Sequence, residues 1–408
     1  MKKIWDKWTR IALVKRILVG LILGAILGIA VPQATGIAIL GDVFVSALKA
    51  IAPLLVFFLV ISSLCNAGKS HGGVIKTVII LYMFSTVLAA VIAVFASMAF
   101  PVKMTLANAA TDTSAPQGIV EVLNNLLLNV VANPVSSLVN ANYVGILMWA
   151  VLLGLAFRVA DKMTKKVLAD VADGISVVVT WIINLAPFGI FGLVFNTVST
   201  NGLDIFTTYG KLLLLLVGCM LFIYFVTNPL LVYWCIRQNP YPLIFHCLKR
   251  SALTAFFTRS SAANIPVNMK VCEEMGLDRD TYSVTIPLGA TINMDGAAIT
   301  ITVMTMATAF TLGIHVDIPT AIILSLLAAL SACGASGVAG GSLLLIPMAC
   351  SLFGISDDIS MQVVAVGFII GVVQDSVETA LNSSSDLLLS ASAEFRQWRL
   401  EGKEIKFK

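Results

Sequence analysis

Four polar side chains that can bind ions or charged groups recur within residues 371–390, inside a long apolar segment. They are Asp375, Glu378, Asn382 and Asp386. An α-helix turns by about 100° per residue, so the four lie within an arc of roughly 80° and along roughly 16 Å of the helix axis. An acidic residue in the middle of a membrane helix costs about 2.5–3.5 kcal/mol and usually serves a function. Because apolar residues continue on both sides, we favour a binding site at membrane depth over a helix end whose acids lie in water.

The composition indicates an all-α protein that crosses a lipid bilayer several times. Of its 408 residues, 58% are hydrophobic and 12% are charged, whereas about 25% of the residues in a typical soluble protein are charged. Apolar runs of about 20 residues recur along the chain. No small-residue cleavage site follows the first run, so we expect a retained helix and not a signal peptide. We expect a multi-pass protein of the bacterial cytoplasmic membrane, with no nucleic-acid partner.

Clusters of lysine and arginine predict that both chain termini are cytoplasmic. Six basic residues and one acid occur in residues 1–16, and five basic residues follow position 395. We expect eight membrane-spanning helices, two of them interrupted: 118–160 near Asn133-Pro134 and residues 140–142, and 281–312 near residues 293–296. The predicted spans are 11–31, 43–64, 75–100, 118–160, 173–198 with a kink at Pro187, 209–236, 281–312 and 359–391.

Two further segments are expected to enter and leave the membrane on the same side. Residues 251–268 are too short and too polar to span, and counting them as a span would invert every later segment. We therefore predict re-entrant hairpins at about 243–268 and 318–353. Each contains an Ile-Pro pair after a small or polar tip, at 265–266 and 346–347, which suggests an inverted repeat. Non-helical backbone at membrane depth is tolerated where it lines a cavity, as in secondary transporters.

These interruptions and the polar helix face predict one converging site. Residues 259–261, 293–295 and 336–342 are expected to meet the 375–386 face. Freed backbone N–H groups suit a carboxylate, and freed carbonyls suit a cation. The oxygens of Asn293, Asp295 and Asp386 are ligands of the type that hard cations prefer. Since the chain contains no GxxxxGK[ST] phosphate-binding loop, we expect coupling to an ion gradient and not to ATP.

Three sequence features resemble the dicarboxylate/amino acid:cation symporter family. They are TRSSAANIPV at 258–267, PLGATINMDG at 287–296 and the spacing from Asp375 to Asp386. The similarity covers nearly the whole chain and is closest to the branch of bacterial sodium:serine/threonine symporters. It implies a glutamate-transporter-like elevator fold with inverted repeats, a homotrimer, and co-transported Na⁺. It also implies a scaffold of about 11–64 and 118–200 and a transport domain of about 74–100 and 209–391.

The resemblance also implies residue roles. The substrate ammonium would bind Asp375, and the α-carboxylate would bind Asn382. One implied sodium site consists of Asn293, Asn382 and Asp386, and another of Tyr82, Ser85, Thr86 and Asp295. Further implied substrate contacts are Ser260 and Ser261 on the first hairpin tip, Gly337 and Val338 on the second, and Thr379 on the last helix. The tip serine that follows Ser261 in the glutamate branch is Ala262 here.

Glu378 departs from the dicarboxylate branch, whose members have an arginine at this position to pair with the substrate's side-chain carboxylate. A glutamate would repel an acidic side chain. Arg259, on the first hairpin tip, is expected to pair with Glu378 and close the pocket. The remaining space would suit a small neutral side chain with a hydroxyl, so we predict serine and threonine as substrates, L-enantiomers in each case.

Alternatives were an intramembrane protease, a channel and a proton-coupled symporter. Residues 334–337, GASG, match a G-x-S-G serine motif, but a serine nucleophile needs a base and none of the three histidines is expected within a helix. Asp295 and Asp375 lack the surroundings of an aspartyl protease. A channel needs a continuous pore lining, whereas these oxygens cluster at one depth. Proton coupling would use Glu378, but retention of Asp295 and Asp386 favours sodium. We therefore predict a transporter and not an enzyme.

Overall fold

The computed structural model describes residues 11, 13–66, 73–106, 128, 131–202, 205–335 and 340–405. Every regular element in this part of the chain is a helix, which confirms the all-α prediction. Six helical segments are long and apolar enough to cross a membrane, since about 20 apolar residues span its hydrocarbon core. They are Thr35–Asn66, Gly73–Ala99, Lys162–Asn184, Phe206–Ile236, Arg279–Thr311 and Asp357–Leu400.

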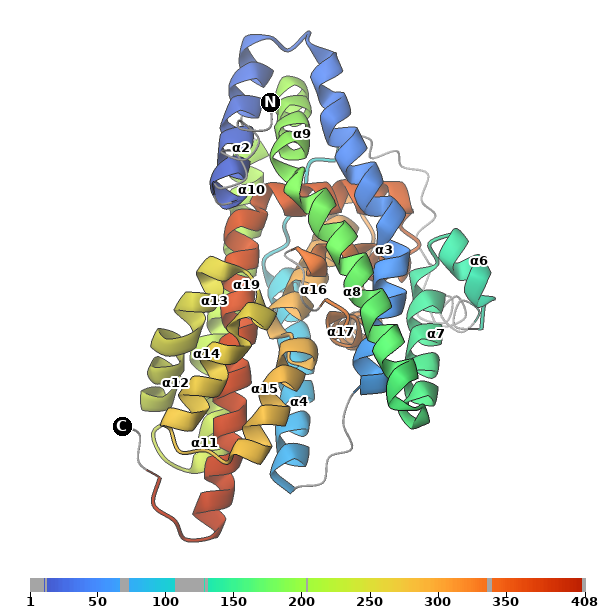
Figure 1. The fold of residues 1–408 in the computed structure, drawn as a ribbon. Helices are drawn as coiled ribbons and strands as arrows, with labels where there is room; N and C mark the ends of the chain where they lie inside the picture. Colours follow the sequence, from blue (N-terminus) through green and yellow to red (C-terminus); the bar gives the residue numbers. More distant parts are fainter. Residues whose placement is uncertain are drawn as a thin grey trace.

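The N-terminal helices pack against those that precede position 202. Helix α2 (Leu13–Ala30) lies along α9 (Ala186–Asn201), and α3 (Ile39–Asn66) contacts α7, α8 and α9 (Figure 1). The η1 turn (Thr35–Ala38) joins α2 to α3. Glycine is required where α2 meets α9: a Cβ on Gly20 would lie 2.2 Å from the Pro187 carbonyl oxygen, and one on Gly24 would lie 2.6 Å from that of Phe191. Small residues permit this close approach of membrane helices.

The interruption predicted within 118–160 is confirmed in the described residues. Helix α6 (Pro134–Val139) and α7 (Tyr143–Ala156, followed by the η2 turn Phe157–Val159) are separate and are capped by Asn133 and Asn142. The span predicted at 173–198 is instead two helices, α8 (Lys162–Asn184) and α9, which meet at Leu185. Pro187 lies in the first turn of α9, where its missing N–H costs least. Residues 107–127 and 129–130 lie outside the described part.

The C-terminal half is organised around α19 (Asp357–Leu400), a helix of 44 residues. It runs to the lower end of the view in Figure 1, beside α12 to α15. Most of it is buried, including the polar residues of its central part. Around it lie α4 (Gly73–Ala99), the continuous segment α10 (Ile205–Phe222), η3 (Ile223–Thr227) and α11 (Asn228–Ile236), and the pair α15 (Arg279–Ile292) and α16 (Asp295–Thr311). The predicted break near 293–296 is confirmed at Asn293 and Met294.

Two groups of short helices, named hairpin 1 and hairpin 2, occupy the positions predicted for re-entrant hairpins. Hairpin 1 (residues 241–274) comprises α12 (Tyr241–Cys247), η4 (Leu248–Ala252), α13 (Leu253–Thr258) and α14 (Ser261–Glu274). Its chain reverses at Arg259, whose φ is +52°. Hairpin 2 (residues 318–351) comprises α17 (Ile318–Ala332), η5 (Gly341–Leu345) and α18 (Ile346–Ser351). Residues 336–339, at its tip, lie outside the described part.

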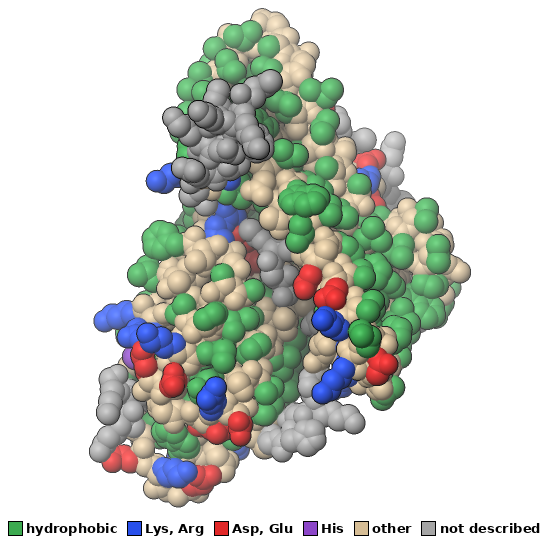
Figure 2. All heavy atoms as spheres, in the orientation of Figure 1, with side chains coloured by type: hydrophobic (Ala, Val, Ile, Leu, Met, Phe, Trp, Pro, Cys, Tyr) green, Lys and Arg blue, Asp and Glu red, His purple; other side chains and the backbone are tan. Residues whose placement is uncertain are grey.

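The surface has a charge distribution suited to a membrane protein. On the face shown in Figure 2, lysine, arginine, aspartate and glutamate side chains gather over the lower half, whereas the upper part is largely hydrophobic or uncharged. Apolar side chains of α2, such as Leu23, Ile26 and Ile29, are 48–57% exposed. An apolar surface of this extent is expected where helices contact lipid.

Candidate functional site

The polar face of α19 is buried in the protein. Relative exposures of its four predicted site residues are 3% for Asp375, 5% for Glu378, 3% for Asn382 and 1% for Asp386. Helix periodicity places these side chains on one side of α19, and their partners come from both hairpins and from the broken helix α15–α16. The sequence therefore correctly predicted which segments converge.

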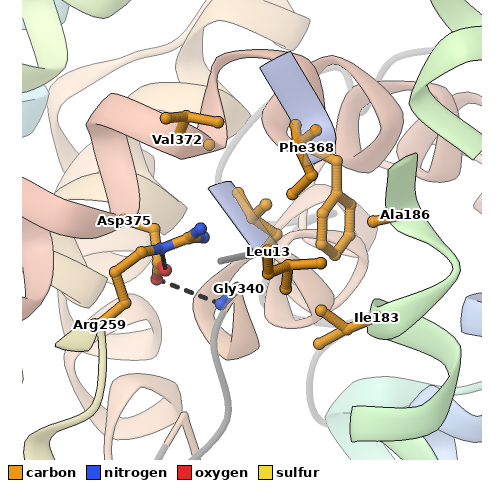
Figure 3. Close-up of a pocket in the computed structure, with 11 residues that line it drawn as sticks. Leu13, Ile183, Ala186, Arg259, Gly340, Phe368, Val372 and Asp375 are labelled. Carbon is orange, nitrogen blue, oxygen red and sulfur yellow. Dashed lines mark hydrogen bonds and ion pairs between the residues drawn. The ribbon is translucent and has the colours of Figure 1, made fainter. Parts of the chain in front are cut away.

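Asp375 lies where the two hairpins meet α19. Its Oδ2 accepts from the Arg259 Nε at 2.6 Å, and its Oδ1 accepts from the Gly340 N–H at 3.1 Å (Figure 3). The expected pairing of Arg259 with Glu378 is wrong. The left-handed backbone at Arg259 directs this side chain to Asp375, one turn earlier on α19, whereas Glu378 is already surrounded by neutral donors.

Glu378 is hydrogen-bonded by three uncharged side chains. Thr300 on α16 donates at 2.7 Å, Ser342 on hairpin 2 at 2.9 Å, and Gln374 on α19 at 2.5 Å. All three reach Oε2. Burial of a carboxylate requires such donors, because a buried charge without hydrogen bonds is costly. Glu378 thus brings a second acidic group to the site without a cationic partner among the described residues.

The break between α15 and α16 brings amide and carboxylate oxygens together. The Gly296 N–H, in the first turn of α16, donates to Asn382 Oδ1 at 2.7 Å. Asn293 donates to Asp386 Oδ1 at 2.9 Å and to the Ser385 hydroxyl at 2.8 Å. The other amide atom, Asn293 Oδ1, is buried and has no hydrogen-bond partner in the described part of the chain. An unpartnered carbonyl oxygen beside a carboxylate is a suitable cation ligand.

A second carboxylate lies among hydroxyl groups. Asp295 accepts from Ser85 at 2.7 Å and from Thr86 at 3.1 Å, both on α4. The Tyr82 hydroxyl instead donates to the backbone carbonyl of Asp386 at 2.9 Å and lies 2.7 Å from the Ser390 hydroxyl. The structure therefore brings Ser85 and Thr86, but not the Tyr82 hydroxyl, into hydrogen-bonding contact with Asp295.

The remaining predicted contacts lie at the hairpin tips and on α19. Ser260 caps α14 by accepting from the Ala263 N–H at 3.2 Å, and Ser261 is buried in the first turn of the same helix. Thr379 is buried on α19. Gly337 and Val338 lie outside the described residues, as does Ser336 of the motif weighed for a protease.

Comparisons with known proteins decide the family. The family model of the Sodium:dicarboxylate symporter family matches residues 13–394. The chain belongs to this family. It is 58% identical to the serine/threonine transporter SstT of Bifidobacterium adolescentis, over 98% of this chain and 93% of the relative. It is also 55% identical to a Streptococcus thermophilus protein with the same name, over 98% of this chain and 100% of the relative.

Membership of the family makes the chain a transport protein and not an enzyme, as predicted. It gives no support to the protease interpretation. In the described part of this symporter, no three acidic, histidine or cysteine side chains form a metal-binding group. The oxygens gathered around Asp295 and Asp386 are those of carboxylate, amide, hydroxyl and carbonyl groups. Such ligand sets suit hard monovalent or divalent cations better than transition metals.

Sequence reasoning missed a buried polar network between hairpin 1 and α19 of the symporter. Asn264 donates to the Ser251 hydroxyl at 2.9 Å and to the Ser383 hydroxyl at 2.8 Å. Asn268 donates to the Ser383 carbonyl at 2.8 Å and accepts from the Ser251 hydroxyl at 2.5 Å. The spacing of the two asparagines, four residues apart on one helix face, was the available signal. Thr300 and Gln374 were also missed, although Gln374 precedes Glu378 by one helical turn, whereas Ser342 belongs to the second tip that the sequence placed at the site.

The space beside Asp375 is small in this conformation of the symporter. A cavity of about 10 Å³ is lined by Arg259, Gly340 and Asp375 on one side and by apolar residues such as Leu13 and Phe368 on the other (Figure 3). This volume suits roughly one water molecule, not an amino acid. The cavity could admit an amino acid only if Arg259 or hairpin 2 moved.

Proposed function

We propose that the protein takes up L-serine and L-threonine together with Na⁺ across the bacterial cytoplasmic membrane. The observation that carries this proposal is the buried polar face of α19, where Asp375 and Asn382 flank a glutamate held by neutral donors. A zwitterion needs an acceptor for its ammonium and a donor for its carboxylate, and these two residue types provide them. The names of the relatives, serine/threonine transporters, support the choice of substrates.

The substrate would exchange partners with groups already present in the site. Its ammonium replaces the Arg259 guanidinium at Asp375, so that the carboxylate keeps a cationic partner throughout. Its carboxylate is bound by the amide of Asn382 and by backbone N–H groups at the hairpin tips. Glu378 repels an aspartate or glutamate side chain but accepts a hydrogen bond from a hydroxyl. Thr379, Ser260, Ser261, Gly337 and Val338 complete the proposed pocket.

Two sodium sites are proposed among α4, the break between α15 and α16, and α19. One uses Asp386, Asn293 and Asn382, supported by the unpartnered Asn293 oxygen. The other uses Asp295 with Ser85 and Thr86, supported by their hydrogen bonds. Tyr82 lies on the same helix as Ser85 and Thr86, and its hydroxyl donates to the backbone carbonyl of Asp386, a residue of the first site. The proposed sodium ligands lie on the same helices, α19 and α16, as the proposed substrate ligands. Binding of sodium would therefore favour the substrate-binding geometry of these helices.

The proposed architecture has eight membrane-spanning segments, two re-entrant hairpins and cytoplasmic termini. A scaffold of about 11–64 and 118–200 would support a transport domain of about 74–100 and 209–391 that moves as an elevator within a homotrimer. The packing supports this division: α2 and α3 contact chiefly α7, α8 and α9, whereas α19 contacts chiefly α4, α10 to α16 and α18 and meets α2, α3 and α9 less extensively. The inverted repeat is supported by the two hairpins, each followed by a long helix with buried polar residues.

Uptake into proteoliposomes tests the function. Purified protein should accumulate radiolabelled serine against its gradient when external sodium exceeds internal sodium, and threonine should compete. Replacement of sodium by choline should abolish accumulation, and aspartate should compete weakly. Uptake driven by a pH gradient without sodium would overturn sodium coupling in favour of proton coupling. Downhill flux without accumulation would favour a channel, and equal uptake of aspartate would reject the substrate assignment.

A further inference from the structure

The three donors to Glu378 are arranged on one oxygen. Thr300, Ser342 and Gln374 all reach Oε2. Gln374 additionally donates to the Thr300 hydroxyl at 2.7 Å, so the same amide contacts both Thr300 and Glu378. Gln374 and Thr300 are fully buried. This cluster of Thr300, Ser342, Gln374 and Glu378 is named the Glu378 cage.

The other carboxylate oxygen of Glu378 has different surroundings. No residue in the described part of the chain donates a hydrogen bond to Oε1, although a carboxylate has about four acceptor positions shared by its two oxygens. Gln374 also has an unpartnered buried oxygen of its own. A buried amide oxygen without a hydrogen-bond partner lowers the stability of the fold. Its contribution therefore lies in what its NH₂ group does, namely to hold Glu378 and Thr300.

We propose that Gln374 is a positioning residue for substrate selectivity. By fixing Oε2 of Glu378 within the cage, it leaves Oε1 to accept the side-chain hydroxyl of the substrate. This inference rests on the proposed function and identifies what selects hydroxyl-bearing amino acids over alanine. A substrate without a hydroxyl leaves Oε1 without this hydrogen bond, and a site built to hydrogen-bond a hydroxyl discriminates strongly against analogues that lack one.

The cage also links selection to hairpin 2. Ser342 is the one cage member from this hairpin, and it lies two residues after Gly340, which contacts Asp375. When hairpin 2 packs against α19, the cage is complete and the carboxylate is fixed. Selection of a substrate with a hydroxyl then requires hairpin 2 to be packed against α19. Gln374 and Thr300 keep Glu378 oriented to accept that hydroxyl.

The test compares serine and alanine uptake by Gln374→Met, which keeps a similar volume and removes both donors. We expect the serine-to-alanine ratio of kcat/KM to fall about tenfold, in line with one lost hydrogen bond to a charged group. The fall should come from a higher KM for serine, with alanine little changed. The matched control is Ser376→Ala, because within the described residues that hydroxyl bonds only to the Val372 carbonyl of its own helix, at 2.9 Å. Its ratio should equal that of the wild type.

Thr300→Val provides a second variant in case Gln374→Met does not fold. It removes a different donor and should lower the same ratio, and the double variant should show less than the sum of the two effects because both act through Glu378. A wild-type ratio in folded Gln374→Met, or equal losses for serine and alanine, would overturn the positioning role. Failure of the proposed function would be distinct, since the wild type itself would then show no sodium-dependent serine uptake.

Discussion

Hairpin 1 and hairpin 2 both reach Asp375, yet the rest of each hairpin is held against α19 by different chemistry. Hairpin 1 is joined to it by a network of four buried polar residues, Ser251, Asn264, Asn268 and Ser383. These side chains are at most 1% exposed. Asn264 Oδ1 has no partner in the described residues, but the other side-chain amide groups of the network are hydrogen-bonded, and opening it would cost these bonds.

Hairpin 2 has its described polar contacts with α19 at the site itself. Gly340 donates to Asp375, and Ser342 donates to Glu378. Its other close contacts are apolar: Phe368 of α19 lies beside Gly340, and Leu343 lies against Gly367. The polar contacts of hairpin 2 with α19 therefore involve the groups that we propose bind the substrate.

The difference assigns the hairpins different mechanical roles. Away from its tip, hairpin 1 is attached by residues that have no proposed ligand, so the position of its helices should depend little on substrate. Hairpin 2 is attached through Asp375 and Glu378, so a bound amino acid competes with or replaces its contacts. Differential contacts of this kind are what allow a ligand to shift a conformational equilibrium. Hairpin 2 is accordingly the element expected to respond to substrate.

The largest effect is expected at Asp375, the residue that both hairpins share. Asp375→Asn removes the charge that pairs with Arg259 and, in our proposal, with the substrate ammonium. We expect serine affinity to fall by about 100-fold or more, equivalent to about 3 kcal/mol for breaking a buried ion pair. Serine-induced thermal shift in the presence of sodium measures this loss. Wild-type affinity in the folded variant would contradict the ammonium assignment.

The next effect tests the attachment of hairpin 1. Asn268→Leu removes the amide that accepts from the Ser251 hydroxyl and donates to the Ser383 carbonyl, so the free energy of unfolding should fall by about 2–3 kcal/mol. Thermal or denaturant unfolding in detergent, followed by tryptophan fluorescence, provides the measurement. The control is Met269→Leu, a neighbouring partly buried position, where a volume-conserving change costs less than about 1.5 kcal/mol. Equal losses in the two variants would show that the network does not anchor the hairpin.

A smaller effect on stability, with a larger effect on transport, is expected in hairpin 2. Ser342→Ala removes one of three donors to Glu378, and Thr300 and Gln374 remain. The free energy of unfolding should change by less than about 1 kcal/mol, whereas the KM for serine should rise about threefold to tenfold. If Ser342→Ala instead destabilised the fold as much as Asn268→Leu, the proposed contrast between the hairpins would be rejected.

The parts of this organisation that depend on local sequence were predictable. The polar face of α19 follows from helix periodicity, and the break at Asn293 and Met294 follows from polar residues within an apolar run. The hairpins follow from segments too short to span. Pairings between distant residues were not predictable. Arg259 reaches Asp375 and not Glu378 because of a left-handed backbone at one residue, and no periodic pattern specifies that geometry.

The same limit applies to the buried network and the Glu378 cage. Asn268 and Ser383 are 115 residues apart, and Thr300 and Glu378 are 78 apart. Their types indicate that they need partners when buried, but several serines and threonines on α16 and α19 were equally available. Only packing selects among them. The separation of Tyr82 from Ser85 and Thr86 is of the same kind. All three lie on one helix, yet Tyr82 contacts the Asp386 carbonyl, whereas Ser85 and Thr86 contact the Asp295 carboxylate.

The smallest expected effect compares two helix caps, one after hairpin 1 and one before hairpin 2. Asp278 caps α15 by accepting from the Thr281 N–H at 2.9 Å, and Asp317 caps α17 by accepting from the Thr320 N–H at 2.8 Å. Side-chain hydrogen bonds from these threonines are the main cause that lowers the pKa of each aspartate. A lowered pKa means that each cap stabilises the fold above the ordinary aspartate pKa and loses this effect as the pH falls through the folded-state value.

Substitution of either cap by alanine should therefore cost up to about 1 kcal/mol near pH 7, and the difference from the wild type should shrink in acid. Unfolding midpoints of Asp278→Ala and Asp317→Ala across the pH range measure both quantities. Similar small losses would show that the hairpins differ through the buried network and not through their caps. A loss at Asp278 that matched Asn268→Leu, or one that did not change with pH, would instead attribute the firm attachment of hairpin 1 to the loop that follows it.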